Sequence, residues 1–193
     1  MKTLRFDDLP PPDGPAAAPL LVPAPHPATL SDADLLAQCD VARGRSGGPG
    51  GQHRNKVETK ITLHHTPTGI DAQAGERRSA AENAAVALRR LRLVLAVAAR
   101  APVPPGEARS ELWLRRCPER AGGRITCNPD HHDYPALLAE ALDTLESCAL
   151  DMRRAAARLC CSPSQLTKLI KDHPPALVRL NARRAAAGDH PLH

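Results

Sequence analysis

Hydrophobic and polar positions follow different patterns in successive parts of this 193-residue chain. Between Val57 and His64 apolar and polar residues alternate, which predicts a half-buried strand. Cys39–Arg43 is predicted as a short strand before it, and Ile70–Ala74 as a returning strand after a Pro- and Gly-containing turn. From Ser79 to Arg100 there is no Pro or Gly, and apolar residues recur at helical spacing. This stretch predicts one long amphipathic helix.

Capping residues mark further helices. Ser31 is a candidate N-cap for a short helix over Asp32–Gln38. The chain from Tyr134 to Gly188 is predicted to be helical, with a first amphipathic helix around Leu137–Leu145. Three more helices are expected there, over Asp151–Leu159, from Pro163 (after an N-cap at Ser162) to Lys171, and from Pro174 to the region of Gly188.

Together these patterns predict an α+β fold. A small domain, made of a short sheet and a long helix, is followed by a helical C-terminal module. We expect a proline-rich disordered or extended arm over 1–28, because this segment holds eight prolines. The other expected boundaries are 29–100 for the sheet-and-helix domain, 101–133 for a linker or irregular region, and 134–193 for the helical module. In the irregular region Trp113 is expected to be a packing residue.

Charge is distributed unevenly along the chain. Residues 1–40 carry a net charge of −4, residues 41–100 carry +7, and residues 101–193 carry +2. The positive segment indicates a domain that faces nucleic acid. Aromatic content is only 2%, which disfavours RNA-binding modules that stack bases on aromatic side chains. No apolar run reaches the length of a membrane span and the N-terminus lacks a signal-peptide pattern, so we expect a cytoplasmic protein without a membrane partner.

The most informative segment is the glycine loop, Gly47-Gly48-Pro49-Gly50-Gly51. Such a run cannot form the interior of a helix or strand. Its spacing does not match a P-loop or a dinucleotide fingerprint. Basic residues flank it on both sides, which predicts an exposed loop that brings backbone N–H groups close to a polyanion. These flanking residues are Arg43, Arg45, Arg54, Lys56 and Lys60.

Gly50-Gly51-Gln52 and its surroundings resemble the GGQ motif of class I peptide chain release factors, which free the finished peptide from tRNA on the ribosome. The resemblance covers Leu30 to Arg100, about a third of the chain. This sequence departs from many members at Arg54, Glu58, Gly75 and Ala80, outside the motif core. The matching residues are Arg45-Ser46, His53, Asn55, Lys56, Leu63, His65, Pro67-Thr68-Gly69-Ile70, Arg78-Ser79, Asn83 and Ala87.

The resemblance implies hydrolysis of the ester that joins a peptide to the terminal ribose of tRNA. It implies catalytic roles for Gly50, Gly51 and Gln52, with the backbone N–H of Gln52 as the oxyanion donor. Ribosomal RNA of the peptidyl transferase centre and peptidyl-tRNA are the implied partners, and no cofactor or metal is required. Arg78 and Asn83 would mainly brace the domain. RNA contacts are expected from Arg43, Arg45, His53, Arg54, Asn55, Lys56 and Lys60.

Within this family, the chain resembles the short, codon-independent relatives that rescue stalled ribosomes. The motif begins at residue 50, only 93 residues follow the long helix, and we find no tripeptide codon reader. Rescue factors often end in a basic tail. Arg179, Arg183 and Arg184 form a weak version of one and are therefore candidate RNA-binding residues.

A second motif leaves two interpretations open. Ala156–Ile170 resembles a helix-turn-helix in which Cys160 replaces the usual turn glycine. It could bind nucleic acid, or it could be a packing or protein-binding module. A helix-turn-helix binder and a ribosome- or RNA-binding protein without catalysis are the alternatives to an esterase. Cys117, Cys127, His131 and His132 lack the close pairing of zinc ligands, so we expect no metal there.

Overall fold

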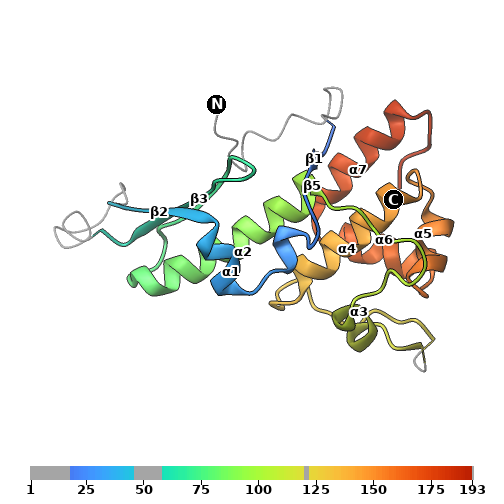
Figure 1. The fold of residues 1–193 in the computed structure, drawn as a ribbon, viewed down its shortest axis with the longest axis horizontal. Helices are drawn as coiled ribbons and strands as arrows, with labels where there is room; N and C mark the ends of the chain where they lie inside the picture. The colour runs from blue at the N-terminus through green and yellow to red at the C-terminus, as the bar shows by residue number, and fades with distance from the viewer. Residues whose placement is uncertain (1–17, 46–57, 120–121, 193) are drawn as a thin grey trace. The chain divides into compact units, whose positions relative to one another are not determined.

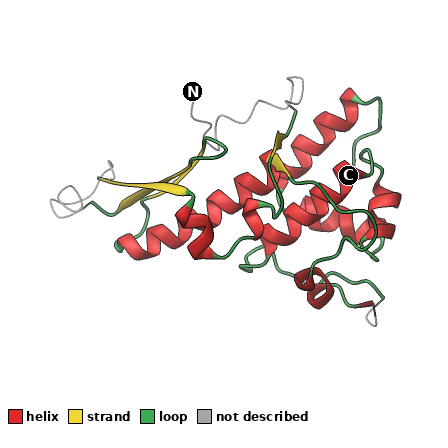
Figure 2. Cartoon of the chain, in the orientation of Figure 1, coloured by secondary structure: helices red, strands yellow, loops and turns green. Residues whose placement is uncertain are grey.

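The computed structural model describes residues 18–45, 58–119 and 122–192. The chain is a mixed α+β protein with a small sheet, a long helix and several C-terminal helices, as predicted (Figures 1 and 2). It divides into two compact units, and the division falls after Leu95. The described part of the first unit is 30–45 and 58–95. The described part of the second unit is 18–29, 96–119 and 122–192.

The first unit is built on a three-stranded antiparallel sheet. Its strands are β2 (Cys39–Gly44), β3 (Lys60–His65) and β4 (Ile70–Ala74), with β3 in the centre. Gly44 pairs with Lys60 at one end of β2 and β3, and Cys39 pairs with His65 at the other. β3 buries alternate residues, so the predicted half-buried strand is confirmed, although it begins at Lys60 instead of Val57.

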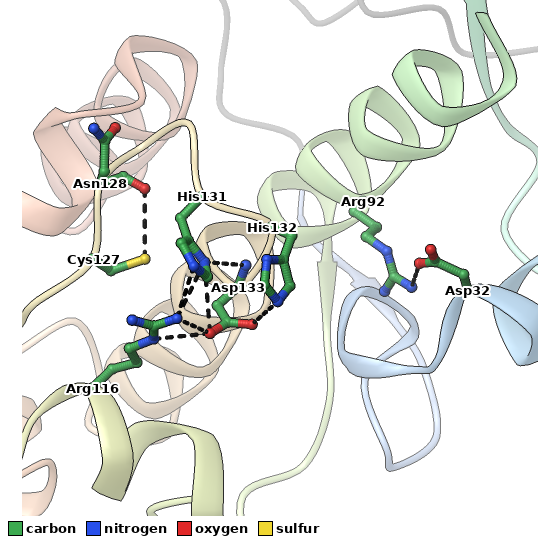
Figure 3. Close-up of polar contacts among 8 residues, drawn as sticks. All are labelled: Asp32, Arg92, Arg116, Cys127, Asn128, His131, His132 and Asp133. Atoms are coloured by element: carbon green, nitrogen blue, oxygen red, sulfur yellow. Dashed lines mark hydrogen bonds and ion pairs between the residues drawn. The ribbon is translucent and has the colours of Figure 1, made fainter. Parts of the chain in front are cut away.

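Two helices complete this unit. α1 (Asp32–Ala37) is capped by Ser31, whose hydroxyl accepts the N–H of Asp34, and this confirms the predicted cap. α2 is the predicted long helix and spans Ala80–Ala98, and its residues up to Leu95 belong to this unit. Arg92 on α2 forms an ion pair of 2.7 Å with Asp32 on α1 (Figure 3). The unit's core is apolar and consists of the buried residues Leu35, Ile61, Leu63, Ile70, Ala72, Ala74, Ala87, Leu88, Leu91, Val94 and Leu95.

The second unit is mostly helical. Its helices are α3 (Glu111–Arg116), α4 (Tyr134–Ser147), α5 (Met152–Arg158), α6 (Pro163–Lys171) and α7 (Pro174–Ala186). α4 lies at the centre, because it contacts α5 and α6 and buries most of its residues. Among the described residues, no helix is both long and apolar enough to cross a membrane.

The structure differs from the expected extended arm within residues 18–28. β1 (Leu20–Leu21) pairs in parallel with β5 (Ala99–Arg100), and η2 (Pro27–Thr29) is a short 3-10 helix. His26, Pro27 and Ala28 are buried, which fixes this segment in the second unit. Strands of two residues, such as β1 and β5, are too short to show a periodic pattern in the sequence. Sequence analysis therefore could not predict these strands. The rest of the expected arm lies outside the described residues.

Candidate functional site

The catalytic residues predicted from the motif, Gly50, Gly51 and Gln52, lie outside the described residues. The same is true of His53, Arg54, Asn55 and Lys56. The structure does describe both ends of the connection that contains them. β2 leads into this connection and β3 leads out of it, and the two strands are paired where it begins and ends. We call the two described ends of this connection its stems: the first stem is Gly44–Arg45 and the second is Glu58–Lys60. The candidate site is defined by these stems.

The two stems meet at paired backbones and at an ion pair. Gly44 and Lys60 are register partners across β2 and β3. Beyond them, Nε of Arg45 lies 3.8 Å from a carboxylate oxygen of Glu58. Both side chains are more than half exposed, so this ion pair stabilises the stems by less than about 1 kcal/mol. The antiparallel pairing is the main constraint that brings the ends together.

Asn83 is hydrogen-bonded to the second stem. Its side chain is fully buried in the first turn of α2. The amide Nδ2 donates to the carbonyl of Thr59 at 2.6 Å and to the carbonyl of Arg77 at 3.0 Å. Its Oδ1 accepts the N–H of Arg77 at 2.9 Å. Asn83 thus connects the residue before β3 to the start of α2, a geometry that fits the bracing role implied by the resemblance.

A buried histidine fixes the opposite end of the sheet. His65 Nδ1 lies 2.6 Å from the hydroxyl of Thr68, and its Nε2 lies 3.0 Å from Oε1 of Gln38. Burial, with a smaller contribution from His64, lowers the pKa of His65 and keeps the ring neutral near pH 7. Gln38 also accepts the N–H of Thr66 through its carbonyl. These bonds hold the turn between β3 and β4 against the end of α1.

The described cations near the stems differ in their exposure. Arg43 and Arg45 are exposed, whereas Lys60 is half-buried at the start of β3. Arg43 belongs to β2 and is the register partner of Ile61. The structure therefore brings Arg43, Arg45 and Lys60 together at one end of the sheet, next to the connection that carries the motif.

The candidate residues near the C-terminus are held by partners within the second unit. Arg183 forms a two-point ion pair with Glu146, which lowers the pKa of that carboxyl. Arg184 donates to the carbonyls of Leu150 and His190. Arg179 is half-buried, and burial lowers its pKa. A contact of Arg183 or Arg184 with RNA would have to compete with these bonds.

The structure gathers a polar cluster before α4 that sequence reasoning only partly anticipated (Figure 3). Candidate ligand atoms of His131, His132 and Asp133 lie within 4.8 Å of one another. Arg116 occupies the same cluster and donates to Asp133 through Nε at 2.8 Å. Partial burial raises the pKa of Asp133, but this hydrogen bond and the neighbouring positive charges outweigh burial and lower that pKa. The guanidinium would repel a metal cation, which supports the prediction that no metal binds here. That statement remains a prediction.

Comparison with known proteins identifies a domain that contains both stems. A family model described as RF-1 domain matches residues 35–111. The chain is 33% identical over 133 residues to peptide chain release factor 1 of Chlorobaculum tepidum, a match that covers 60% of this chain and 35% of that protein. It is 45% identical over 60 residues to the chloroplastic peptide chain release factor PrfB1 of Arabidopsis thaliana, covering 31% of this chain and 13% of that one.

The matched segments are short relative to these proteins. A third relative, peptide chain release factor 1 of Acidiphilium cryptum, is 40% identical over 79 residues, which are 41% of this chain and 21% of that protein. The chain thus spans from about an eighth to about a third of the length of these curated relatives. No solved structure gives a significant match. Residues 35–111, which include β2, β3, β4 and α2, thus match the RF-1 domain, and over this segment the chain is similar to class I peptide chain release factors.

Proposed function

We propose that this protein is a release-factor-like peptidyl-tRNA hydrolase that acts on the ribosome through its GGQ loop. One observation carries the proposal: the RF-1 match over 35–111 spans Gly50-Gly51-Gln52 and the two paired stems that present this segment. Asn83, a residue of the family pattern, is buried and bonded to one of those stems. Because the proposed substrate is on the ribosome, the proposed location is the cytoplasm.

The proposed chemistry is attack of water on the ester between the peptide and the tRNA ribose. The bond between the ester carbonyl carbon and the ribose oxygen breaks. Water supplies the hydroxyl of the released peptide acid and the proton of the ribose oxygen. The N–H of Gln52 would donate to the oxyanion as it forms, and Gly50 and Gly51 would allow close approach of the backbone. The Gln52 side chain would restrict the space so that water reaches the ester. Ribosomal RNA and the tRNA ribose would complete the site.

Contacts with ribosomal RNA are proposed for the cations at the stems. Arg43 and Arg45 are exposed beside the connection, and residues 41–100 carry the net charge of +7. Such side chains bind phosphate oxygens and set the orientation of a protein on RNA. The proposal extends to Lys60 and to His53, Arg54, Asn55 and Lys56 in the connection.

We further propose that release does not require a stop codon. Reading single-stranded bases commonly uses exposed aromatic side chains for stacking. Trp113 and Tyr134 are the tryptophan and the tyrosine within the described part of the chain, and both are fully buried. This supports the codon-independent rescue branch over a codon-reading factor.

Peptide release from purified ribosomal complexes tests both parts of the proposal. Ribosomes carrying labelled peptidyl-tRNA would be prepared with an empty A site, with a sense codon and with a stop codon. The proposed function predicts release that depends on the protein and does not require the stop codon. Release that occurs only with a stop codon would contradict codon independence. Ribosome binding without release in any complex would favour the non-catalytic alternative.

A further inference from the structure

The segment from α5 to α6 has the geometry of a helix-turn-helix. α5 ends in a Schellman motif, in which the N–H of Cys161 donates to the carbonyl of Ala156 and the N–H of Cys160 donates to that of Ala157. Cys160 has a φ of 49°, the left-handed conformation that the usual turn glycine would adopt. Ser162 then caps α6 by accepting the N–H of Gln165.

The rest of the second unit holds this segment from one side. The indole Nε1 of Trp113 donates to the carbonyl of Leu159 at 2.9 Å, at the end of α5. The hydroxyl of Tyr134 donates to the carbonyl of Leu169 at 2.7 Å, within α6. Oε1 of Gln165 accepts the N–H of Ile125. One face of the two helices therefore packs against the core of the second unit. The hydrogen bonds fix the orientation of α5 and α6 within that unit.

The other face is polar and exposed. On α6, Leu166, Leu169 and Ile170 are buried, whereas Ser164, Lys168 and Lys171 are exposed at positions i, i+4 and i+7. On α5, Ala155 and Ala156 are buried and Arg153 and Arg154 are exposed. We call the set Arg153, Arg154, Ser164, Lys168 and Lys171 the α5–α6 outer surface.

Positive charge in the C-terminal part of the chain is concentrated on this segment. Residues 151–172 contain five basic and two acidic residues, whereas the rest of 101–193 contains eight basic and nine acidic ones. Both acidic residues of the segment have local partners. Asp151 accepts the backbone N–H groups of Arg153 and Arg154, and Asp172 pairs with Lys168 at 2.6 Å.

The cations that remain are available for a ligand. Within the described part of the chain, the side chains of Arg153, Arg154 and Lys171 form no ion pair. This contrasts with Arg183 and Arg184 on α7, whose guanidinium groups are bonded inside the unit. α5 and α6 thus present a basic surface, whereas the arginines of α7 near the chain's end are bonded within the unit.

We propose that the α5–α6 outer surface binds the phosphate backbone of a nucleic-acid double helix. Arginine, lysine and serine side chains on a rigid helical scaffold are the groups that contact phosphates. The α5–α6 outer surface contains no aromatic side chain, which disfavours a single strand, because a single strand is held by stacking. RNA and DNA duplexes share this backbone. The proposal is independent of peptide release, because it concerns α5 and α6 alone and can be tested without ribosomes.

Fluorescence anisotropy with the purified full-length protein tests this proposal. The probes are an RNA duplex and a DNA duplex of the same sequence, about 20 base pairs long so that a double-strand-binding domain fits, and the matching single-stranded RNA. Affinity would be measured over a range of salt concentrations for the wild type and for Arg153→Gln/Arg154→Gln. A charge-matched control, Arg77→Gln/Arg115→Gln, removes two exposed arginines elsewhere. Arg153→Lys/Arg154→Lys retains the charge.

The wild type is expected to bind duplex more tightly than the single strand. The slope of log affinity against log salt should become shallower by about 2 in Arg153→Gln/Arg154→Gln, because two phosphate contacts are lost. The control and the lysine variant should keep most of the slope. Binding of only one duplex type identifies the source of the backbone. The proposal is overturned if no duplex binds, if the single strand binds better, or if the control loses as much affinity as Arg153→Gln/Arg154→Gln while thermal unfolding shows all variants folded.

Discussion

Replacing Asn83 by alanine should weaken both the fold of the first unit and the function of its loop. The change removes three hydrogen bonds, two donated to the carbonyls of Thr59 and Arg77 and one accepted from the N–H of Arg77. At a net value of about 1 kcal/mol each, unfolding should cost about 3 kcal/mol less. A protein of ordinary stability, with about 5–15 kcal/mol, would remain folded. The free energy of unfolding from urea titration measures the loss.

Peptide release by the folded variant should also be slower than release by the wild type. Thr59 directly precedes β3 and follows the segment with the GGQ motif, so loss of its hydrogen bond to Asn83 would loosen one stem. A displacement of about 1 Å can cost about 10²-fold in rate. Release would be measured at a temperature at which the variant is folded. Glu82→Ala, an adjacent exposed residue, is the control and should change stability by less than about 1 kcal/mol. The reasoning is refuted if Asn83→Ala is no less stable than Glu82→Ala and releases peptide at the wild-type rate.

Three further predictions concern the second unit. Cys160→Gly should stabilise the protein by up to about 1 kcal/mol and raise the melting temperature by a few degrees, because Cys160 is exposed and has a φ of 49°; a lower melting temperature would contradict this. Gly123→Ala should lower stability by about 1–3 kcal/mol, since an added Cβ would lie 2.3 Å from the carbonyl oxygen of Cys160 and the φ of Gly123 is 67°; an unchanged urea midpoint would count against the packing. Burial raises the pKa of Asp143 from 3.8 to about 7, opposed by Arg100, so the folded state binds more protons than the unfolded state between these values. Stability of the wild type should therefore fall, relative to Asp143→Asn, as pH rises from about 4 to about 7; parallel pH profiles would disprove the shift.

Helices were the part of the fold that sequence patterns predicted best. α6 runs from Pro163 to Lys171 with Ser162 as its cap, as expected, because the cap, the proline and the apolar spacing all mark the same boundaries. The expected strand over Ile70–Ala74 was also confirmed. Strand β3 was placed too early, since alternation continues through Val57 and Thr59 although pairing with β2 begins only at Lys60. The pairing of β1 with β5 depends on a tertiary contact that a local pattern cannot show.

The sequence indicated a candidate site but not the hydrogen bonds that support its ends. The glycine motif and the family pattern pointed to the connection between β2 and β3, whereas the bond from Asn83 to Thr59 joins residues 24 positions apart. The basic residues near the C-terminus show another limit of sequence patterns. Arg183 and Arg184 resemble a free basic tail in sequence, but Glu146 and the carbonyl of Leu150 hold them. A run of charges does not reveal which of them has an internal partner.

The central claim is that the backbone around Gln52 catalyses peptide release. Single-turnover release from ribosomes that carry peptidyl-tRNA and an empty A site, measured for the wild type and for Gly51→Ala at saturating protein, tests it most directly. A Cβ at Gly51 should misplace the donor N–H of Gln52 and reduce the rate by about 10² or more, with ribosome binding retained. Release by Gly51→Ala at the wild-type rate, or no release by the wild type from ribosomes that it demonstrably binds, would contradict the account.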